Sequence, residues 1–165
     1  MALLKVEKLS KSFSGLKAVS NLDMEIEAGE LVGLIGPNGA GKTTVFNLIT
    51  GVYKPDQGRI IFNGQNIVGL APHAICARGI ARTFQNIRLF NDLSVLDNVK
   101  IASHKNVPYN FLAAIIRSPR FFKGEDIIEN EAMKYLKIFK LDDKKDELAK
   151  NLPYGEQRRL EIARA

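Results

Sequence analysis

The sequence predicts a mixed α/β fold with an antiparallel β lobe near its start and a helical lobe near its end. Apolar and polar residues alternate with period two in the first third of the chain, which is typical of half-buried strands. A glycine-rich segment at 36–43 lies between an apolar run and a helical run. From about residue 91 the composition becomes helical. These three observations indicate a strand, loop and helix unit with two lobes added to it.

Composition and charge limit the number of domains, the cellular compartment and the kinds of partner. The chain has 165 residues, of which 45% are hydrophobic, so one domain with a real core is expected. A net charge of +6 permits a nucleic-acid or membrane partner, but 24 basic residues among 18 acidic ones are a mild excess that decides nothing. The single cysteine, Cys76, excludes an internal disulfide and favours the cytosol. No apolar run is long enough to span a bilayer and the N-terminus lacks a signal-peptide layout, so we expect membrane association only through a partner.

The first elements are strands. Residues 2–9 and 21–27 alternate at period two, and we expect each to be a half-buried strand. Between them Phe13 lies in a polar, loop-like setting. Its ring could stack on a purine or pack on the rim of the sheet, and the residues alone leave both interpretations open.

Residues 36–43 match the phosphate-binding pattern G-x-x-x-x-G-K-[ST] in full. The run 31–35 before them predicts a strand, and a helix is expected to begin near Lys42. Glycines let successive backbone N–H groups turn toward one anion, and the N-terminus of a helix carries a partial positive charge. The Lys42 ammonium group could bind the outer phosphates, and the Thr43 hydroxyl could bind Mg²⁺. A glycine-rich turn without a ligand is disfavoured because both flanks agree with the pattern. The candidate nucleotide-binding residues of this segment are Gly36, Pro37, Asn38, Gly39, Ala40, Gly41, Lys42, Thr43 and Thr44.

The next elements follow from turn signals. Two short apolar runs around Asn63-Gly64 predict a hairpin. Residues 72–78 predict a short helix that ends at Gly79, and 80–84 predict a further strand. Gln85 follows that strand and, taken alone, is a loop amide.

Helices are expected after this point. Residues 94–97 resemble a capping box that opens a helix through Ser103. The stretch 104–123 is basic and aromatic. It could dock on a membrane-embedded partner or on phosphate backbones. Alternatively, it is a solvated lobe tip whose aromatic residues pack inward. Residues 125–140 predict an amphipathic helix. A last helix is expected to begin near Gly155. Its free N–H groups would attract an anion, or it is an ordinary capped helix. The expected apolar side of the 125–140 helix is Ile128, Ala132, Tyr135 and Phe139.

Three segments together resemble the ATP-binding subunits of ABC transporters. They are 36–43, 81–86 and 152–165, which occur in the order and spacing of that family across the whole chain. The resemblance implies an ABC-type P-loop NTPase core, with a nucleotide-binding part at 1–90 that includes the β lobe and a helical lobe at 91–154. Residues 155–165 would form a truncated signature helix.

The resemblance also implies roles for single residues. Phe13 would stack on adenine, and Gln85 would contribute to Mg²⁺ and to the attacking water, with Lys42 as the other catalytic residue. Tyr154, Gly155 and Glu156 would contact the γ-phosphate of ATP held by a second subunit. The segment departs from the common signature, because Pro153 stands where a serine hydroxyl is usual and Tyr154 replaces a glycine.

Residues 82–90 and 154–164 look most like those of branched-chain amino-acid importers. This implies a coupled ATPase that uses ATP and Mg²⁺, with a second ABC ATPase subunit, identical or different, and integral permease subunits as partners at the cytoplasmic face of the membrane. Another cargo, such as urea or a lipid-linked molecule, is an alternative. A soluble ABC protein acting on nucleic acid is a third, although no direct nucleic-acid partner is expected.

The family's apolar strand ending in Asp-Glu and its switch histidine have no match here, since neither His73 nor His104 lies at a suitable place. We therefore expect an N-terminal piece of a longer subunit, with the C-terminal part of the core missing. Such a piece would lack the general base and show almost no ATPase. It would also expose an apolar sheet edge and tend to self-associate.

Overall fold

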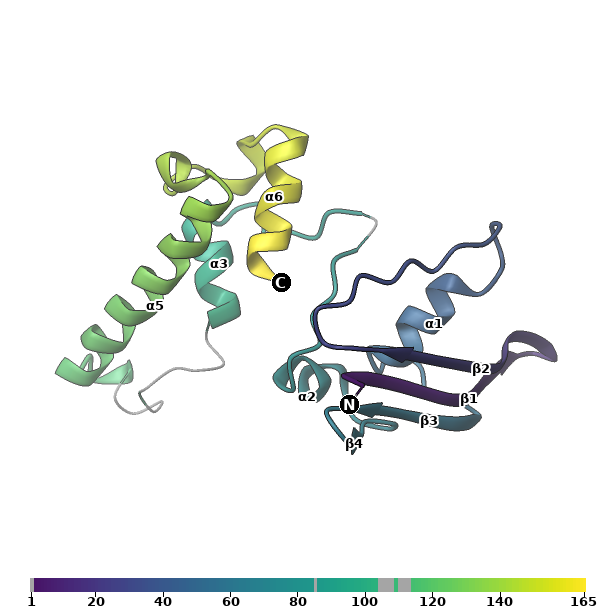
Figure 1. The fold of residues 1–165 in the computed structure, drawn as a ribbon. Helices are drawn as coiled ribbons and strands as arrows, with labels where there is room; N and C mark the ends of the chain where they lie inside the picture. Colours follow the sequence, from purple (N-terminus) through teal and green to yellow (C-terminus); the bar gives the residue numbers. More distant parts are fainter. Residues whose placement is uncertain (1, 85, 104–108, 110–113) are drawn as a thin grey trace. The chain divides into compact units, whose positions relative to one another are not determined.

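The computed structural model describes residues 2–84, 86–103, 109 and 114–165. The chain divides into two compact units, Met1–Ala81 and Arg82–Ala165 (Figure 1). The segment 82–90, which the sequence placed with the nucleotide-binding part, is therefore grouped with the helices.

The first unit contains a four-stranded sheet in the order β2-β1-β3-β4, and each neighbouring pair is antiparallel. The expected strands at 2–9 and 21–27 are confirmed within longer ones, and the Asn63-Gly64 hairpin is confirmed by the pairing of Phe62 with Gln65. The strands are β1 Leu4–Phe13, β2 Leu16–Ile26, β3 Gln57–Phe62 and β4 Gln65–Asn66.

Phe13 lies in a different local structure from the loop that the sequence suggested. It is the last residue of β1 and pairs with Leu16, the first residue of β2. Ser14 and Gly15 form the turn between them, both with positive φ (45° and 87°), as two-residue hairpin turns require. The expectation of a loop was wrong because the polar residues around Phe13 belong to an exposed hairpin end.

Two expected strands are absent from the described residues. Neither 31–35 nor 80–84 has strand structure, and the exposed fractions of Leu31 and Ile35 are 99% and 93%. A strand needs a neighbour to accept and donate its ladder hydrogen bonds. The described residues provide no such neighbour for either segment, so β-competent composition alone did not make a strand.

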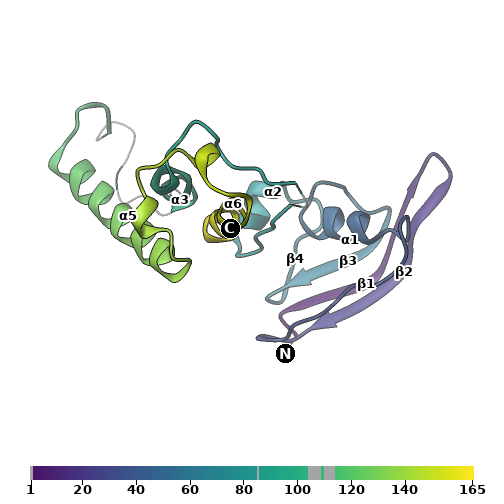
Figure 2. The same cartoon turned by 90° about the horizontal axis from the view of Figure 1, so that it is seen from above.

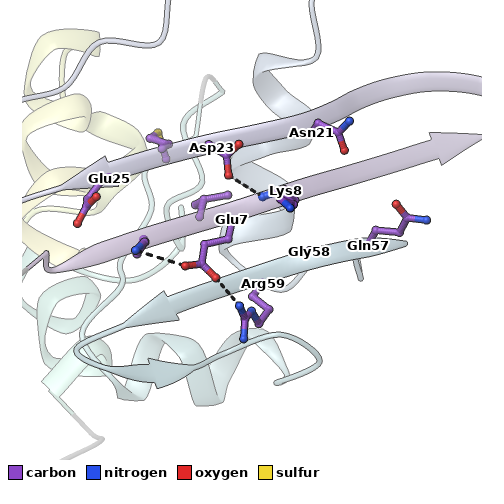
Figure 3. Close-up of a pocket in the computed structure, with 11 residues that line it drawn as sticks. Glu7, Lys8, Asn21, Asp23, Glu25, Gln57, Gly58 and Arg59 are labelled. Carbon is purple, nitrogen blue, oxygen red and sulfur yellow. Dashed lines mark hydrogen bonds and ion pairs between the residues drawn. The ribbon is translucent and has the colours of Figure 1, made fainter.

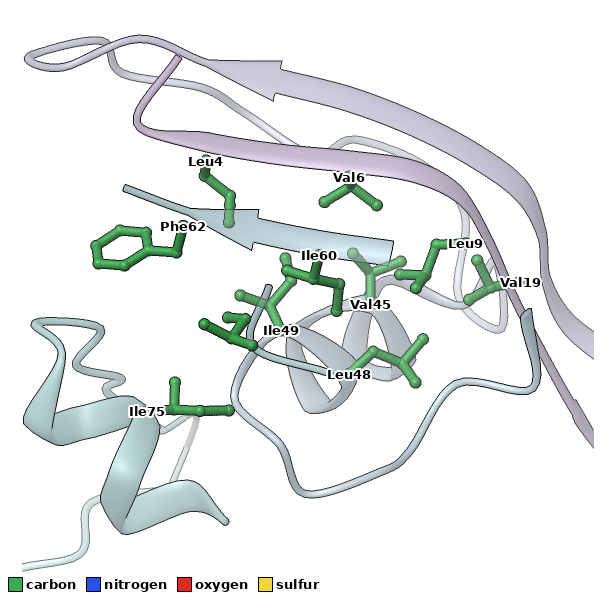
Figure 4. Packing of buried hydrophobic residues seen from close by; sticks show 11 residues of the cluster. Leu4, Val6, Leu9, Val19, Val45, Leu48, Ile49, Ile60, Phe62 and Ile75 are labelled. Atoms are coloured by element: carbon green, nitrogen blue, oxygen red, sulfur yellow. The ribbon is translucent and has the colours of Figure 1, made fainter. Parts of the chain in front are cut away.

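Helix α1 (Lys42–Ile49) covers one face of the sheet (Figure 2). Its buried residues pack with the inward residues of β1 and β3, which alternate along each strand (Figure 4). Helix α2 (Pro72–Ala77) adds Ile75 to the same core, and Gly79, with φ of 106°, follows its end as expected. The residues of α1 that enter this core are Val45, Leu48 and Ile49.

The second unit is helical and has its own core. The capping box is confirmed, because the Ser94 hydroxyl donates to Asp97 Oδ2 at 2.7 Å and accepts from Asp97 N at 3.0 Å. The long helix begins earlier than the sequence suggested because Ser118 caps it and Pro119 suits its first turn. The elements are α3 Val95–Ser103, α5 Pro119–Ile138, the 3-10 turns η2 Asp142–Lys144 and η3 Ala149–Asn151, and α6 Tyr154–Arg164.

The buried face of α5 differs from the expected one. Ile128 and Ala132 are buried as expected, but Tyr135 is exposed and its neighbour Leu136 is buried. The face that packs inward therefore follows the i, i+4 spacing from Gly124 through Leu136. Across the described part of the chain, no helix combines the length and the apolarity that crossing a bilayer needs.

Candidate nucleotide-binding site

The segment 36–41 forms a turn that leads directly into α1. Pro37 O accepts the Ala40 amide at 3.2 Å, and Gly39 has φ of 84°. Gly41 is the N-cap residue of α1, with φ of 81°, and its carbonyl accepts the first helical bond from Val45 N at 2.9 Å. The helix start and its positive end therefore lie where the loop ends.

Lys42 folds back over this loop. Its Nζ donates to Gly36 O and to Pro37 O, both at 2.6 Å. The ammonium group thus lies against the beginning of the loop although its backbone belongs to α1. This arrangement places a positive charge and the N-terminus of a helix on the same short segment, which suits a polyphosphate.

The remaining predicted loop residues are accessible. Asn38 and Ala40 are exposed in the loop, and Thr43 is exposed as the second residue of α1. Thr44 follows it and is half-buried. An exposed hydroxyl beside Lys42 fits a Mg²⁺ ligand, because Mg²⁺ prefers few protein oxygens and keeps several waters.

Gly41 also fixes the loop to the sheet. A Cβ on Gly41 would lie 2.2 Å from Ala18 O of β2, so the close approach needs glycine. Ala18 is two residues after Leu16, the partner of Phe13, which corresponds to about 7 Å along the strand. The structure therefore brings the end of the hairpin that carries Phe13 close to Gly41, the loop residue that precedes Lys42.

The Phe13 ring is 39% exposed and is held at one edge. Tyr53 packs edge-to-face against it, with centroids 5.1 Å apart, and Lys11 Nζ is 5.4 Å from its centroid. Asp56 accepts from Lys11 Nζ and from Ser12 N, both at 2.7 Å. The Lys11 ammonium, followed by the Ser12 amide, lowers the pKa of the Asp56 carboxyl. Sequence reasoning missed Tyr53 and Asp56, since only strand pairing brings residues about 40 positions away beside Phe13.

The signature-like residues form the first turn of α6. Pro153 O accepts from Glu156 N at 2.9 Å and from Gln157 N at 3.0 Å. The Glu156 carboxylate accepts from Lys144 Nζ at 2.7 and 2.8 Å, and this hydrogen bond raises the pKa of Lys144. Tyr154 is 68% exposed, and Gly155 follows it with open space around its Cα.

The second unit also joins two segments that the sequence treated separately. Arg158 of α6 donates to Phe84 O at 2.6 Å, so the 82–90 segment lies against the signature-like helix. Gln85 lies outside the described residues. Phe13 and the phosphate loop thus share the first unit, whereas Phe84 and the signature-like turn share the second.

Part of the basic segment 104–123 lies outside the described residues. Of the remainder, Tyr109 donates to Glu125 Oε1 at 2.5 Å and its ring packs edge-to-face on Phe121. The Glu125 carboxylate raises the pKa of Tyr109 to about 12. These two rings are packed within the helical unit, while Phe122 is exposed.

A polar groove lies on the face of the sheet opposite α1 (Figure 3). Glu7 contacts Lys5 at 3.3 Å and Arg59 at 2.9 Å, and Asp23 accepts the Lys8 amide at 2.8 Å. Acidic and basic groups neutralise one another across this face. The groove therefore lacks the concentration of positive charge that the phosphate loop provides.

Comparison with known proteins agrees with the loop geometry. The family described as "ABC transporter" matches residues 19–165. The chain is similar to the high-affinity branched-chain amino acid transport ATP-binding proteins BraF of Pseudomonas aeruginosa (43% identity) and LivG of Escherichia coli K12 (42%), in each case over 98% of this chain and 64% of the relative. It is also similar to a solved ATP-binding cassette of an ABC transporter in its ADP conformation, with a TM-score of 0.81 and 32% identity over 99% of this chain and 64% of that one. The chain spans about two thirds of the length of these relatives. It belongs to the ABC transporter ATP-binding family.

Proposed function

We propose that this chain binds Mg²⁺-ATP and serves in an ATP-hydrolysing subunit that energises an importer of branched-chain amino acids. The observation that carries the proposal is the arrangement at the start of α1. Lys42 Nζ lies 2.6 Å from two loop carbonyls, and the left-handed Gly41 begins the helix. A triphosphate could take over the ammonium group from those carbonyls and accept the loop amides at the same time.

Each residue of the proposed site has a chemical task. Residues 36–44 would bind the phosphates, Thr43 with Gln85 would hold Mg²⁺, and Phe13 would stack on the adenine. When bound, Mg²⁺ would neutralise charge on the phosphates. The first turn of α6, at 154–156, would contact the nucleotide of a second subunit through backbone amides, because the Glu156 carboxylate is already paired with Lys144.

The cargo and the partners are inferred from the relatives, whose names specify branched-chain amino acid transport. We propose a second ATP-binding subunit and membrane permease subunits as partners, which would place the protein at the cytoplasmic face of the membrane. We also infer that these 165 residues alone hydrolyse little ATP, since none of the matched segments supplies the Asp-Glu pair of a general base.

The proposal is tested with the full-length subunit and its permease in vesicles. We expect leucine, isoleucine or valine to stimulate ATP hydrolysis and to accumulate only when ATP is present. If urea or a lipid-linked molecule stimulates hydrolysis instead, that molecule is the cargo and the assignment to branched-chain amino acids is wrong. An absence of Mg²⁺-ATP binding in equilibrium titration would reject the site itself.

Replacing Phe13 with alanine tests the adenine contact. Stacking on an aromatic ring contributes about 1–3 kcal/mol per base, so we expect ATP affinity to fall roughly 5- to 150-fold. Isothermal titration with ATP and with inorganic triphosphate measures the effect. The triphosphate, which has no base, should bind both variants equally. Tyr53→Ala is the companion variant: it keeps the Phe13 ring but removes the ring that packs against its edge, so we expect a smaller loss of ATP affinity. An equal loss of ATP and triphosphate affinity in Phe13→Ala would contradict the stacking role.

A further inference from the structure

Glu161 is a buried carboxylate on α6 that the proposed nucleotide contacts do not use. Only 3% of its surface is exposed. Its Oε2 accepts from Arg158 NH1 at 2.8 Å, and its Oε1 lies 3.4 Å from the backbone nitrogens of Phe84 and Arg88. A charge in this setting needs its partners, because an unpaired buried carboxylate is costly.

Arg158 extends this contact in both directions. Its NH1 donates to Phe84 O at 2.6 Å, and its Nε donates to the hydroxyl of Tyr154 at 3.3 Å. The guanidinium also lies over the Tyr154 ring, 5.6 Å from the centroid. The planar guanidinium of Arg158 therefore connects Tyr154, the exposed first residue of α6, to the backbone carbonyl of Phe84, 70 positions earlier in the sequence.

Described residues on both sides of position 85 make further contacts. The guanidinium groups of Arg82 and Arg88 lie 5.0 and 4.5 Å from the centroid of the Phe84 ring. Arg164 lies 5.3 Å from the ring centroid of Phe90. Because Glu161 and Arg158 are one turn apart, both groups face this segment from the same side of α6. The contacts on Phe84 and Arg88 bracket position 85 in the sequence.

We propose that Arg158 and Glu161 are positioning residues that make Phe84 and Arg88 move with the first turn of α6. An event at Tyr154, where the proposed function places nucleotide of a second subunit, would then reach both flanks of Gln85 through one guanidinium and one carboxylate. This inference rests on the proposed function for the identity of that event, but the connection between the two segments stands on the contacts alone.

The test uses Arg158→Lys and the double change Arg158→Gln with Glu161→Gln in the full-length subunit. Lysine keeps a positive charge for Glu161 but cannot reach both Tyr154 and Phe84 as a planar fork does. The double variant leaves no unpaired charge. We expect both to show faster amide hydrogen exchange in 82–90, and to lose about tenfold in permease-stimulated ATP hydrolysis while ATP affinity stays unchanged.

Arg159→Gln is the matched control on the same helix. Its guanidinium donates to Phe139 O at 2.8 Å and lies 3.5 Å from Glu156 Oε1, and it does not belong to the contacts around Phe84. We expect it to leave amide hydrogen exchange on both sides of position 85 as in the parent protein. Unchanged exchange in 82–90, or full stimulation, in the two test variants would overturn the inference. If the parent protein shows no stimulated hydrolysis, the proposed function is rejected. The exchange measurement would still test whether Arg158 and Glu161 connect Phe84 and Arg88 to the first turn of α6.

Discussion

Replacing Lys42 with alanine is expected to weaken Mg²⁺-ATP binding roughly 10- to 150-fold, since each charge-assisted hydrogen bond contributes about 1.5–3 kcal/mol. The ammonium group lies against the loop at 2.6 Å from Gly36 O and Pro37 O, so it is already close to the proposed phosphate site. Equilibrium titration of the full-length subunit measures the change.

Lys54→Ala is the control for net charge. Lys54 is exposed in the same unit, and its loss changes the charge of the protein by the same amount. We expect it to leave ATP affinity within a factor of two, because exposed charges at a distance are screened by salt. Equal affinity losses in the two variants would show that general electrostatics, and not the loop, binds the nucleotide.

Replacing Gly41 with alanine is expected to destabilise the first unit by at least about 2 kcal/mol. Two effects combine here. Alanine is strained at φ of 81°, and its Cβ would lie 2.2 Å from Ala18 O, so β2 or the start of α1 must shift. ATP binding should fall with it, because the same shift moves Lys42. Urea unfolding followed by far-ultraviolet circular dichroism measures the stability.

Gly39→Ala separates the two effects. Gly39 has nearly the same φ, 84°, but a Cβ there would meet no atom within 4 Å. We expect a loss of only about 1–2 kcal/mol from the backbone strain. If the two alanine variants lose equal stability, the contact between Gly41 and Ala18 contributes nothing and the proposed packing of the loop on β2 is wrong.

Elements with local causes were predicted well. The Asn63-Gly64 turn, the capping box of Ser94 and Asp97, and the short helix before Gly79 depend on residues within a few positions of one another. The structure has all three. The helix start at Lys42 belongs to this group as well, because the pattern that predicts it lies within eight consecutive residues, whereas phosphate binding by the loop stays a prediction.

The errors concern elements that depend on distant partners. The run 31–35 has β-forming composition, yet it is not a strand in the structure, because ladder hydrogen bonds require a neighbour. The inward face of α5 was misjudged at Tyr135 because the packing partners of a helix, and not its own pattern, select the exact stripe.

The sequence by itself determined the helix start at Lys42 after the glycine-rich loop, the Asn63-Gly64 hairpin and the family resemblance, since all of these are carried by contiguous residues. Only the tertiary structure decided that Phe13 is supported by Tyr53, that Gly41 touches Ala18 and that Glu161 and Arg158 hold Phe84. Each of these contacts joins residues that are between 23 and 77 positions apart. Strand pairing and helix packing bring such residues together, and no short pattern in the chain specifies them.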